Sequence, residues 1–268
     1  MDNRPIGIFD SGLGGLTCVK KVMELLPHED IIYFGDTGRV PYGSRSPETI
    51  VKYTRQDIRF LESFDIKYII IACGTASSAA LPWIQQEFTT EICGVLKPAC
   101  QAAVSATRNG KIGVIGTQGT VRSGKYEDTL KELDANLSVI SKACPLFVPL
   151  VENGHTEGQL AYLAAEEYLL PVKNAGVDTL ILGCTHYPLL KDTIRQVMGD
   201  SVTLIDAGAE TAAVAKRRLE ELDLLAEDRK GTARYYVSDR VEGFTDIAQM
   251  FLNREIEGCV KQIEIEGY

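Results

Sequence analysis

The feature that most constrains the fold is a regular alternation of short apolar runs with longer amphipathic stretches. Because alternating strands and helices of these lengths form parallel sheets covered by helices, the pattern predicts an α/β protein. The runs are rich in Val, Ile and Leu without alternation, as expected of strands buried on both faces. The predicted strands lie at 5–9, 31–34, 68–72, 92–95, 112–115, 146–150, 179–182 and 202–205. The predicted helices lie at about 15–26, 47–64, 76–88, 98–108, 123–133, 158–174, 188–198 and 208–222.

The chain also resembles itself at a spacing of about 110 residues. The run IGIFDSGLGG from Ile6 resembles IGVIGTQGT from Ile112, and YIIIACGTAS around Cys73 resembles TLILGCTHYP around Cys184. We therefore expect two pseudo-symmetric domains, each a mostly parallel sheet flanked by helices. The last stretch adds a strand at 233–238 and a helix near 242–254, and we expect it to return to the first half. The predicted domains are 1–97 with 208–268, and 98–207.

Charge and cysteine usage exclude several classes of protein. The net charge is −9 without a basic cluster, which argues against nucleic acid as a partner. The N-terminus lacks a signal-peptide core and no apolar run approaches the roughly 18 residues of a membrane span, so we expect a cytoplasmic protein without membrane contact. The seven cysteines are odd in number and contain no CxxC pair, which argues against disulfides and structural zinc.

Candidate site residues follow the predicted strands, because ligands of α/β proteins bind beyond the carboxyl ends of their strands. Asp10 and Ser11 open a glycine-rich turn whose N–H groups could face an anion. Thr17 stands where a dinucleotide fingerprint needs a small residue, which argues against a nucleotide cofactor. The simpler alternative is a strand-to-helix turn capped by Ser11.

Two cysteines occupy corresponding strand ends. Cys73 precedes Gly74 and Thr75, and Cys184 precedes Thr185 and His186. A single cysteine in such a place is usually a small buried hydrophobe, but a matched pair favours reactive thiols. A helix that begins just after each strand would lower the pKa of the thiol. His186 could then act as an acid, a base or an orienting group, or simply cap a helix.

Three further segments are candidate ligand contacts. Glu152 follows the predicted strand at 146–150, and His155 lies three residues later. A metal would need a third ligand of suitable geometry, so we predict none. The loop 35–46 carries Tyr42 and Gly43, and the loop 116–120 carries Thr117 and Thr120. Either loop could also be a plain turn.

Paired thiols on opposite sides of a cleft suit one kind of reaction. A single base tends to return a proton to the face from which it came. Two bases on opposite faces of a carbon invert it, because one takes a proton while the other gives one. Cys73 and Cys184, held as one thiolate and one thiol, would thus invert an amino acid at its α-carbon without a cofactor.

Several motifs in a fixed order make the sequence similar to the glutamate racemases of the aspartate/glutamate racemase superfamily. The resemblance covers nearly the whole chain. The motifs are FDSGLGG at 9–15, YFGDT at 33–37, PYG at 41–43, ACGTAS at 72–77, the stretch from Ile115 to Tyr126 and LGCTHYP at 182–188.

The resemblance implies a cofactor-independent enzyme that interconverts L- and D-glutamate and supplies D-glutamate for peptidoglycan, and hence for cell-wall biogenesis and cell shape. It implies two α/β domains with the active site in the cleft between them, commonly in a homodimer. Cys73 would take the proton from the D-isomer with help from Asp10. Cys184 would take it from the L-isomer with help from His186 and Glu152. The substrate-binding positions would be Ser11, Tyr42, Gly43, Gly74, Thr75, Thr117, Thr120 and Thr185.

Gly74 departs from the family pattern, which usually has Asn directly after the first cysteine. The loss of one hydrogen bond to a charged group costs roughly 1.5–3 kcal/mol. Three alternatives stay open beside a glutamate racemase, and Gly74 favours only the second of them. They are a racemase for aspartate or another acidic amino acid, a non-catalytic binding protein of the same fold, and a thiol hydrolase that uses Cys184, His186 and Glu152.

Overall fold

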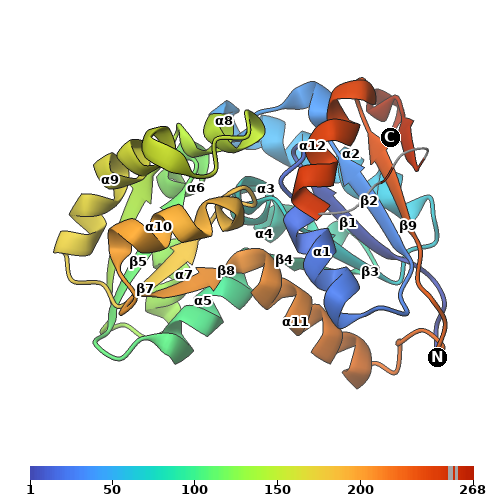
Figure 1. Ribbon diagram of the computed structural model, residues 1–268. Helices are drawn as coiled ribbons and strands as arrows, with labels where there is room; N and C mark the ends of the chain where they lie inside the picture. The colour runs from blue at the N-terminus through green and yellow to red at the C-terminus, as the bar shows by residue number, and fades with distance from the viewer. Residues whose placement is uncertain (253–255, 257–258) are drawn as a thin grey trace.

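The computed structural model describes residues 1–252, 256 and 259–268, and it contains two sheets whose paired strands all run parallel (Figure 1). The six-stranded sheet has the order β10-β9-β2-β1-β3-β4, and the four-stranded sheet has the order β6-β5-β7-β8. The predicted α/β fold is confirmed. The strands are β1 (Ile6–Asp10), β2 (Ile31–Gly35), β3 (Tyr68–Ile71), β4 (Glu91–Gly94), β5 (Lys111–Gly116), β6 (Ser138–Ala143), β7 (Thr179–Leu182), β8 (Thr203–Asp206), β9 (Ala233–Val237) and β10 (Val260–Gln262).

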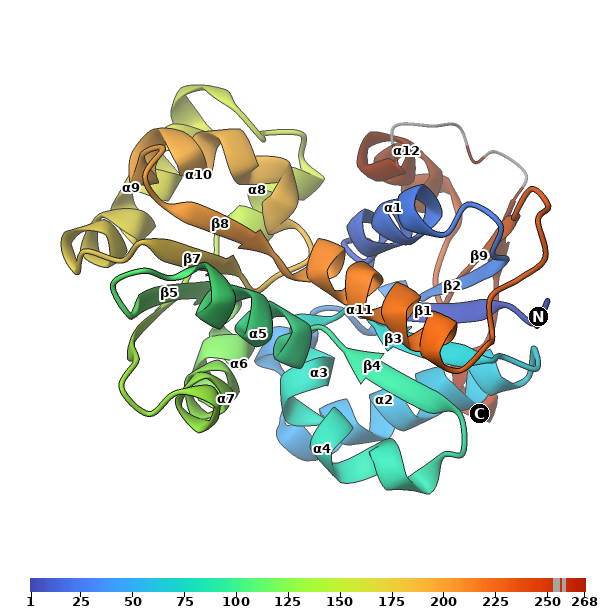
Figure 2. The same cartoon turned by 90° about the horizontal axis from the view of Figure 1, so that it is seen from below.

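Helices cover both sheets and link them. Figure 2 shows α11 leading from β8 of the four-stranded sheet back toward the six-stranded one, where it packs against α1. No helix within the described part of the chain is long and apolar enough to cross a bilayer. The helices are α1 (Leu16–Leu25), α2 (Pro47–Glu62), α3 (Gly74–Ala79), α4 (Leu81–Ile84), α5 (Leu96–Ala106), α6 (Gln118–Arg122), α7 (Lys125–Leu133), α8 (Phe147–Glu152), α9 (Gly158–Asn174), α10 (Lys191–Met198), α11 (Ala207–Glu221) and α12 (Glu242–Leu252).

The two halves share one topology, as the internal similarity predicts. The order β2-β1-β3-β4 in the first sheet matches β6-β5-β7-β8 in the second. The strand before Cys73 therefore corresponds to the strand before Cys184. The C-terminal segment adds β9 and β10 to the edge of the first sheet beyond β2, so it does return to the first half. The domain boundaries at 97, 98, 207 and 208 stay a prediction.

One predicted strand is wrong. Residues 146–150 lie in a helix, α8, and the strand at this point of the second half is β6, eight residues earlier. The segment is apolar because Phe147, Leu150 and Val151 form the buried face of a short helix, at the spacing i, i+3 and i+4. The true strand was missed because it lies at the edge of its sheet, and Ser138, Ser141 and Lys142 interrupt its apolar residues.

Smaller differences have local causes. The predicted helix at 76–88 is divided into α3, α4 and a 3₁₀ turn, because Pro82 lacks an N–H group and starts a new helix. The three-residue strand β10 was not predicted. The last helix was predicted near 242–254. It ends at Leu252, and positions 253 and 254 lie outside the described residues.

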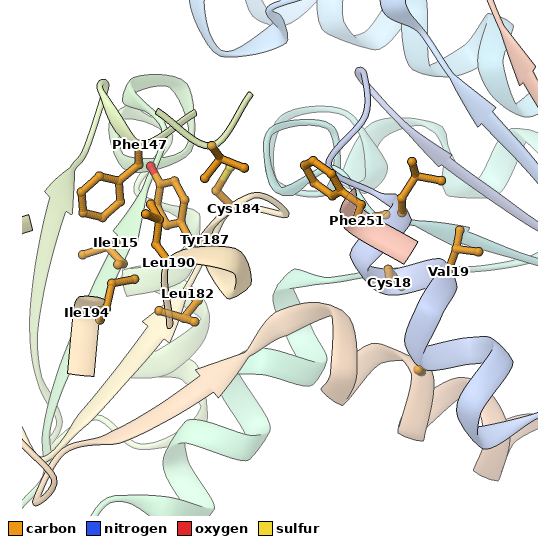
Figure 3. Close-up of a cluster of buried hydrophobic side chains, with 14 of the residues drawn as sticks. Cys18, Val19, Ile115, Phe147, Leu182, Cys184, Tyr187, Leu190, Ile194 and Phe251 are labelled. Carbon is orange, nitrogen blue, oxygen red and sulfur yellow. The ribbon is translucent and has the colours of Figure 1, made fainter. Parts of the chain in front are cut away.

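A buried hydrophobic cluster reaches from one half to the other. Figure 3 shows Phe147, Tyr187 and Leu190 beside Cys184, with Cys18 and Phe251 across from them. Cys184 thus stands at the boundary between this cluster and the space between the halves.

Candidate active site

One cavity of about 350 Å³ lies between the two halves, and all thirteen predicted site residues line it. It opens at the carboxyl ends of β1, β3, β5 and β7, where the topology places the predicted loops. Its predicted lining residues are Asp10, Ser11, Tyr42, Gly43, Cys73, Gly74, Thr75, Thr117, Thr120, Glu152, Cys184, Thr185 and His186. The fold therefore brings the candidates of both halves together at one place.

Cys73 lies directly after β3, at the start of α3. Its sulfur accepts a hydrogen bond from the Ala76 N–H at 3.4 Å, and its thiol donates to the Ser11 hydroxyl at 3.4 Å. Burial raises the pKa of Cys73 to about 12, and the nearby Asp10 carboxyl adds to the rise. The prediction of a lowered pKa is wrong for this thiol. One N–H at a helix start does not offset removal of the sulfur from water.

Asp10 ends β1 and is buried beside Cys73. Its Oδ2 accepts hydrogen bonds from the N–H groups of Gly12 at 3.3 Å and Gly15 at 3.0 Å. Burial raises the pKa of Asp10, while His186 and these N–H groups act against the rise. A Cβ at Gly15 would stand 2.5 Å from the Asp10 Cβ, so this turn requires glycine to hold the carboxyl. The turn thus fixes a carboxyl within the Cys73 side of the cavity.

Cys184 has a different neighbour. Its sulfur lies 3.8 Å from Nδ1 of His186, and Nε2 of that ring lies 3.0 Å from Oε1 of Glu152. Burial lowers the pKa of His186, but the hydrogen bonds to Cys184 and Glu152 outweigh it and raise the pKa to about 10. Phe251 packs edge-on against the imidazole with centroids 5.5 Å apart. An imidazolium of this kind favours the thiolate form of a neighbouring cysteine.

Glu152 reaches this group from an unexpected element. It is the last residue of α8 and does not follow a strand, because the segment before it is helical. Its side chain is 39% exposed, whereas the side chain of His186 is 8% exposed. The pair therefore extends from the solvent edge of the cavity to the buried sulfur.

Three threonine hydroxyls meet across the cleft. The Oγ1 of Thr75, from the first half, lies 3.2 Å from that of Thr117 and 3.3 Å from that of Thr120. The last two, from the second half, are 3.1 Å apart. Each hydroxyl can donate one hydrogen bond, so the group can serve a carboxylate that enters the cavity.

Tyr42 lines the wall, but its hydroxyl serves the protein. The oxygen is hydrogen-bonded to the carboxyl groups of Asp36 and Asp57 behind the wall. Gly43, next to it, packs against the second half, where a Cβ would stand 3.0 Å from Oγ1 of Thr117. This segment therefore presents backbone and ring atoms to the cavity.

The wall also has an apolar part, which was not predicted from the sequence. It is formed by Cys144, Pro145, Val148 and Pro149, from the connection between β6 and α8 and from α8 itself. The helical spacing of the apolar residues at 147, 150 and 151 was the signal that could have revealed it. Among the described residues that line the cavity none is Lys or Arg. Within residues 1–252, 256 and 259–268, no group of three or more His, Cys, Asp and Glu could hold a metal ion.

Gly74 stands where the two halves touch. A Cβ at this position would lie 2.5 Å from the carbonyl oxygen of Gly183, which belongs to the opposite half. Backbone atoms cannot yield as a flexible side chain can. The missing side chain at position 74 therefore lets the halves approach more closely than an Asn would.

Comparison with known proteins shows the family to which the chain belongs. The profile of the family described as Asp/Glu/Hydantoin racemase matches residues 13–215. A glutamate racemase from Geobacter metallireducens is 46% identical over 265 residues, which cover 98% of each chain. The chain belongs to the Asp/Glu/Hydantoin racemase family. The resemblance to glutamate racemases seen in the motifs is thereby confirmed.

Solved structures of this racemase family show how far the likeness extends. A glutamate racemase isoform from Bacillus anthracis is 38% identical with a TM-score of 0.94, over 98% of both chains. A glutamate racemase from Francisella tularensis, in complex with D-glutamate, is 37% identical with a TM-score of 0.93 over the full length of both. An aspartate racemase from Picrophilus torridus is 22% identical with a TM-score of 0.56, and it shares the fold alone.

Proposed function

We propose that this racemase interconverts L- and D-glutamate by moving the α-proton between Cys73 and Cys184, without a cofactor. One observation carries the proposal: the two thiols follow corresponding strands of the two halves and line the same cavity. The names of the full-length relatives support glutamate as the substrate, and one related structure holds D-glutamate.

The proton transfer follows from the two environments. With L-glutamate, the Cys184 thiolate takes the α-proton while the Cys73 thiol gives its proton to the opposite face. The product is D-glutamate, with a thiol at Cys184 and a thiolate at Cys73. The reverse reaction begins from that state, and proton exchange with water restores the first one. His186 and Glu152 stabilise the Cys184 thiolate, and Asp10 assists on the side of Cys73.

Hydroxyl and backbone N–H groups would bind the charged ends of glutamate. As the α-proton leaves, negative charge grows on the α-carboxylate, and fixed donors stabilise it without reorganisation. This role falls to the predicted binding residues, and at Tyr42 to its backbone, because its hydroxyl is already bonded. The set is Ser11, Tyr42, Gly43, Gly74, Thr75, Thr117, Thr120 and Thr185.

The cellular role follows from the reaction. D-glutamate produced in the cytoplasm would enter peptidoglycan synthesis, and through it cell-wall biogenesis and cell shape. We also propose that the chain forms a homodimer, with no nucleic acid or membrane as partner. The proposed domains are 1–97 with 208–268, and 98–207.

The test follows the α-proton by NMR in heavy water, with chelator present and no cofactor added. L-glutamate, D-glutamate, L-aspartate and D-aspartate are supplied separately. We expect exchange and inversion with both glutamates in the wild type, and loss of inversion in Cys73→Ala and in Cys184→Ala. Cys100→Ala is the matched control, because Cys100 is buried in α5 away from the cavity. Inversion of aspartate but not of glutamate would contradict the proposed substrate. Inversion that persists in Cys73→Ala or in Cys184→Ala would contradict the two-thiol mechanism.

A further inference from the structure

A buried polar cluster lies directly behind the cavity wall, and the proposed reaction does not use it. Tyr42, in the 3₁₀ turn Tyr42–Ser44, places its hydroxyl between Asp36, which follows β2, and Asp57, which lies in α2. Arg39 contacts both acids: its Nε donates to Asp36 Oδ2 at 2.6 Å and its Nη2 donates to Asp57 Oδ1 at 2.8 Å. The two carboxyl side chains are 0% exposed. Two acids therefore share one base in a place closed to water.

The hydrogen atoms of the cluster can be counted. The Tyr42 oxygen lies within hydrogen-bond distance of Oδ2 of Asp36 and of Oδ2 of Asp57, at 2.8 Å from the latter. A phenol has one hydrogen, so it can donate to one carboxyl only. Two ionised carboxylates would leave one pair of oxygens in contact without a hydrogen between them. One of the two acids must therefore carry a proton.

The remaining bonds decide which acid carries it. Asp36 also accepts from Arg39 at Oδ2 and from the Ser238 hydroxyl at Oδ1, at 2.7 Å. All of its bonds are those of an ionised acceptor. Within the described part of the chain, Asp57 accepts at Oδ1 from Arg39 alone, and its Oδ2 faces only the Tyr42 oxygen. The proton thus belongs on Asp57 Oδ2, which donates to Tyr42, while Tyr42 donates to Asp36.

Charge balance leads to the same assignment. With Asp57 neutral, Asp36 and Arg39 form one buried ion pair without excess charge. With both acids ionised, a net negative charge would remain in the cluster, which is costly away from water. Burial and the Asp36 charge raise the pKa of Asp57 well above its usual value, although Arg39 acts against the rise. Three further side chains contact Arg39. Oε1 of Gln56 accepts a hydrogen bond from Nη1 at 2.6 Å, and the ring centroid of Tyr53 lies 4.1 Å from Cζ. Oε1 of the exposed Glu266 lies 3.7 Å from Nη1.

We propose that Asp57 is protonated at neutral pH and that the chain Asp57–Tyr42–Asp36 positions the 42–44 wall of the active site. The wall depends on this anchor because its other side meets the opposite half. A Cβ at Gly119 would stand 2.6 Å from the Gly43 carbonyl oxygen. Asp57 touches no substrate and is a positioning residue. The kinetic part of the test rests on the proposed racemisation, whereas the spectroscopic part does not.

The first measurement is the carboxyl ¹³C NMR signal of protein labelled at aspartate. We expect a signal with the shift of a protonated acid at pH 7 in the wild-type enzyme, and its loss in Asp57→Asn. Asp10 is also buried with a raised pKa, so the loss in this variant is what assigns the signal. In Asp36→Asn we expect Asp57 to ionise, because Arg39 then has no other acid to pair with inside the cluster. A wild-type spectrum without a protonated aspartate, or an Asp57→Asn spectrum that retains every protonated signal of the wild type, would overturn the proposal.

The second measurement compares two substitutions of the same residue. Asn at position 57 reproduces the protonated acid, since its amide can donate to Tyr42 and its oxygen can accept from Arg39. We expect Asp57→Asn to keep KM and kcat within about twofold, and Asp57→Ala to raise KM about tenfold with a smaller change in kcat. Thermal melting of both variants shows whether they fold. If Asp57→Asn loses as much as Asp57→Ala, a charged Asp57 is required and the proposal fails. Absence of racemisation in the wild type, with the NMR result intact, would count against the proposed function only.

Discussion

The two halves of the molecule have the same strand order but surround their thiols differently. Cys73 faces the Ser11 hydroxyl and the buried Asp10 carboxyl, and its pKa is raised to about 12. Cys184 faces an imidazole whose own pKa is raised to about 10 and which Glu152 holds from behind. The two thiols therefore occupy equivalent positions of the backbone but have different polar groups beside them.

This difference indicates which of the two thiols is protonated before the substrate binds. Two-base inversion needs one acid and one base, and identical surroundings would leave their assignment undecided. Burial raises the pKa of Cys73 to about 12, so its thiol stays protonated at neutral pH, whereas the sulfur of Cys184 lies 3.8 Å from Nδ1 of His186. In the proposed mechanism, the resting form would thus have its acid at Cys73 and its base at Cys184, as inversion of the L-isomer requires.

The largest effect should come from removal of each thiol. We expect Cys73→Ala and Cys184→Ala to lower racemisation by about 10³-fold or more, because a proton donor or acceptor is lost from one face. Each variant keeps one base. Cys73→Ala should still exchange the α-proton of L-glutamate with solvent, and Cys184→Ala that of D-glutamate, both without inversion. NMR in heavy water detects this, and exchange of both isomers by either variant would contradict the assignment of faces.

The partners of the thiols should give the next largest effect. We expect His186→Asn and Asp10→Asn to lower kcat/KM by about 10²-fold each, since each removes an aid to proton transfer. The loss must be equal in both directions, because the two enantiomers have equal free energy. The primary kinetic isotope effect distinguishes the roles of the two residues. With α-deuterated substrate, the isotope effect on kcat/KM should increase for L-glutamate in His186→Asn and for D-glutamate in Asp10→Asn. Growth for the same isomer in both variants would show that the two groups serve one thiol.

Alkylation compares the two thiols without any substrate. At pH 7 we expect iodoacetamide to modify Cys184 about ten to a hundred times faster than Cys73, because only a thiolate reacts. The pKa of Cys73 lies far above this pH, so its rate should rise about tenfold with each pH unit. Mass spectrometry of peptides gives both rates. In His186→Asn the two rates should converge, and faster labelling of Cys73 in the wild type would reverse the proposed resting state.

The sequence predicted the frame of this site better than its electrostatics. The apolar runs before Asp10, Cys73 and Cys184 predicted the strands that bring these residues together, since the carboxyl ends of parallel strands meet at one edge. Edge strand β6 was missed because polar residues interrupt its apolar ones, as in a half-exposed segment, and the apolar α8 was taken for a strand in its place. The raised pKa of Cys73 depends on how deeply packing buries it, which no local pattern specifies.

The contact between the halves can be changed at two glycines, with smaller expected effects. A Cβ at Gly74 would lie 2.5 Å from the Gly183 carbonyl across the cleft, and a Cβ at Gly183 would lie 2.7 Å from the Ile115 carbonyl within the second half. We expect Gly74→Ala to lower kcat/KM about fivefold to tenfold with little loss of stability, because the halves can separate slightly. Gly183→Ala should lower the free energy of unfolding by about 1–3 kcal/mol, since the clash lies inside one packed unit.

Gly74→Asn sharpens this comparison, because it restores the residue usual in the family together with its amide. The added Cβ meets the same carbonyl, so we expect this variant to be no more active than Gly74→Ala. Urea unfolding and kinetics on all three variants separate stability from activity. If Gly74→Asn raises kcat/KM above that of the wild type, the amide contributes more than the close contact. The wild-type chain then lacks a favourable hydrogen bond at position 74. If Asn and Ala fall together, glycine at this position sets how closely the two thiols can approach the substrate.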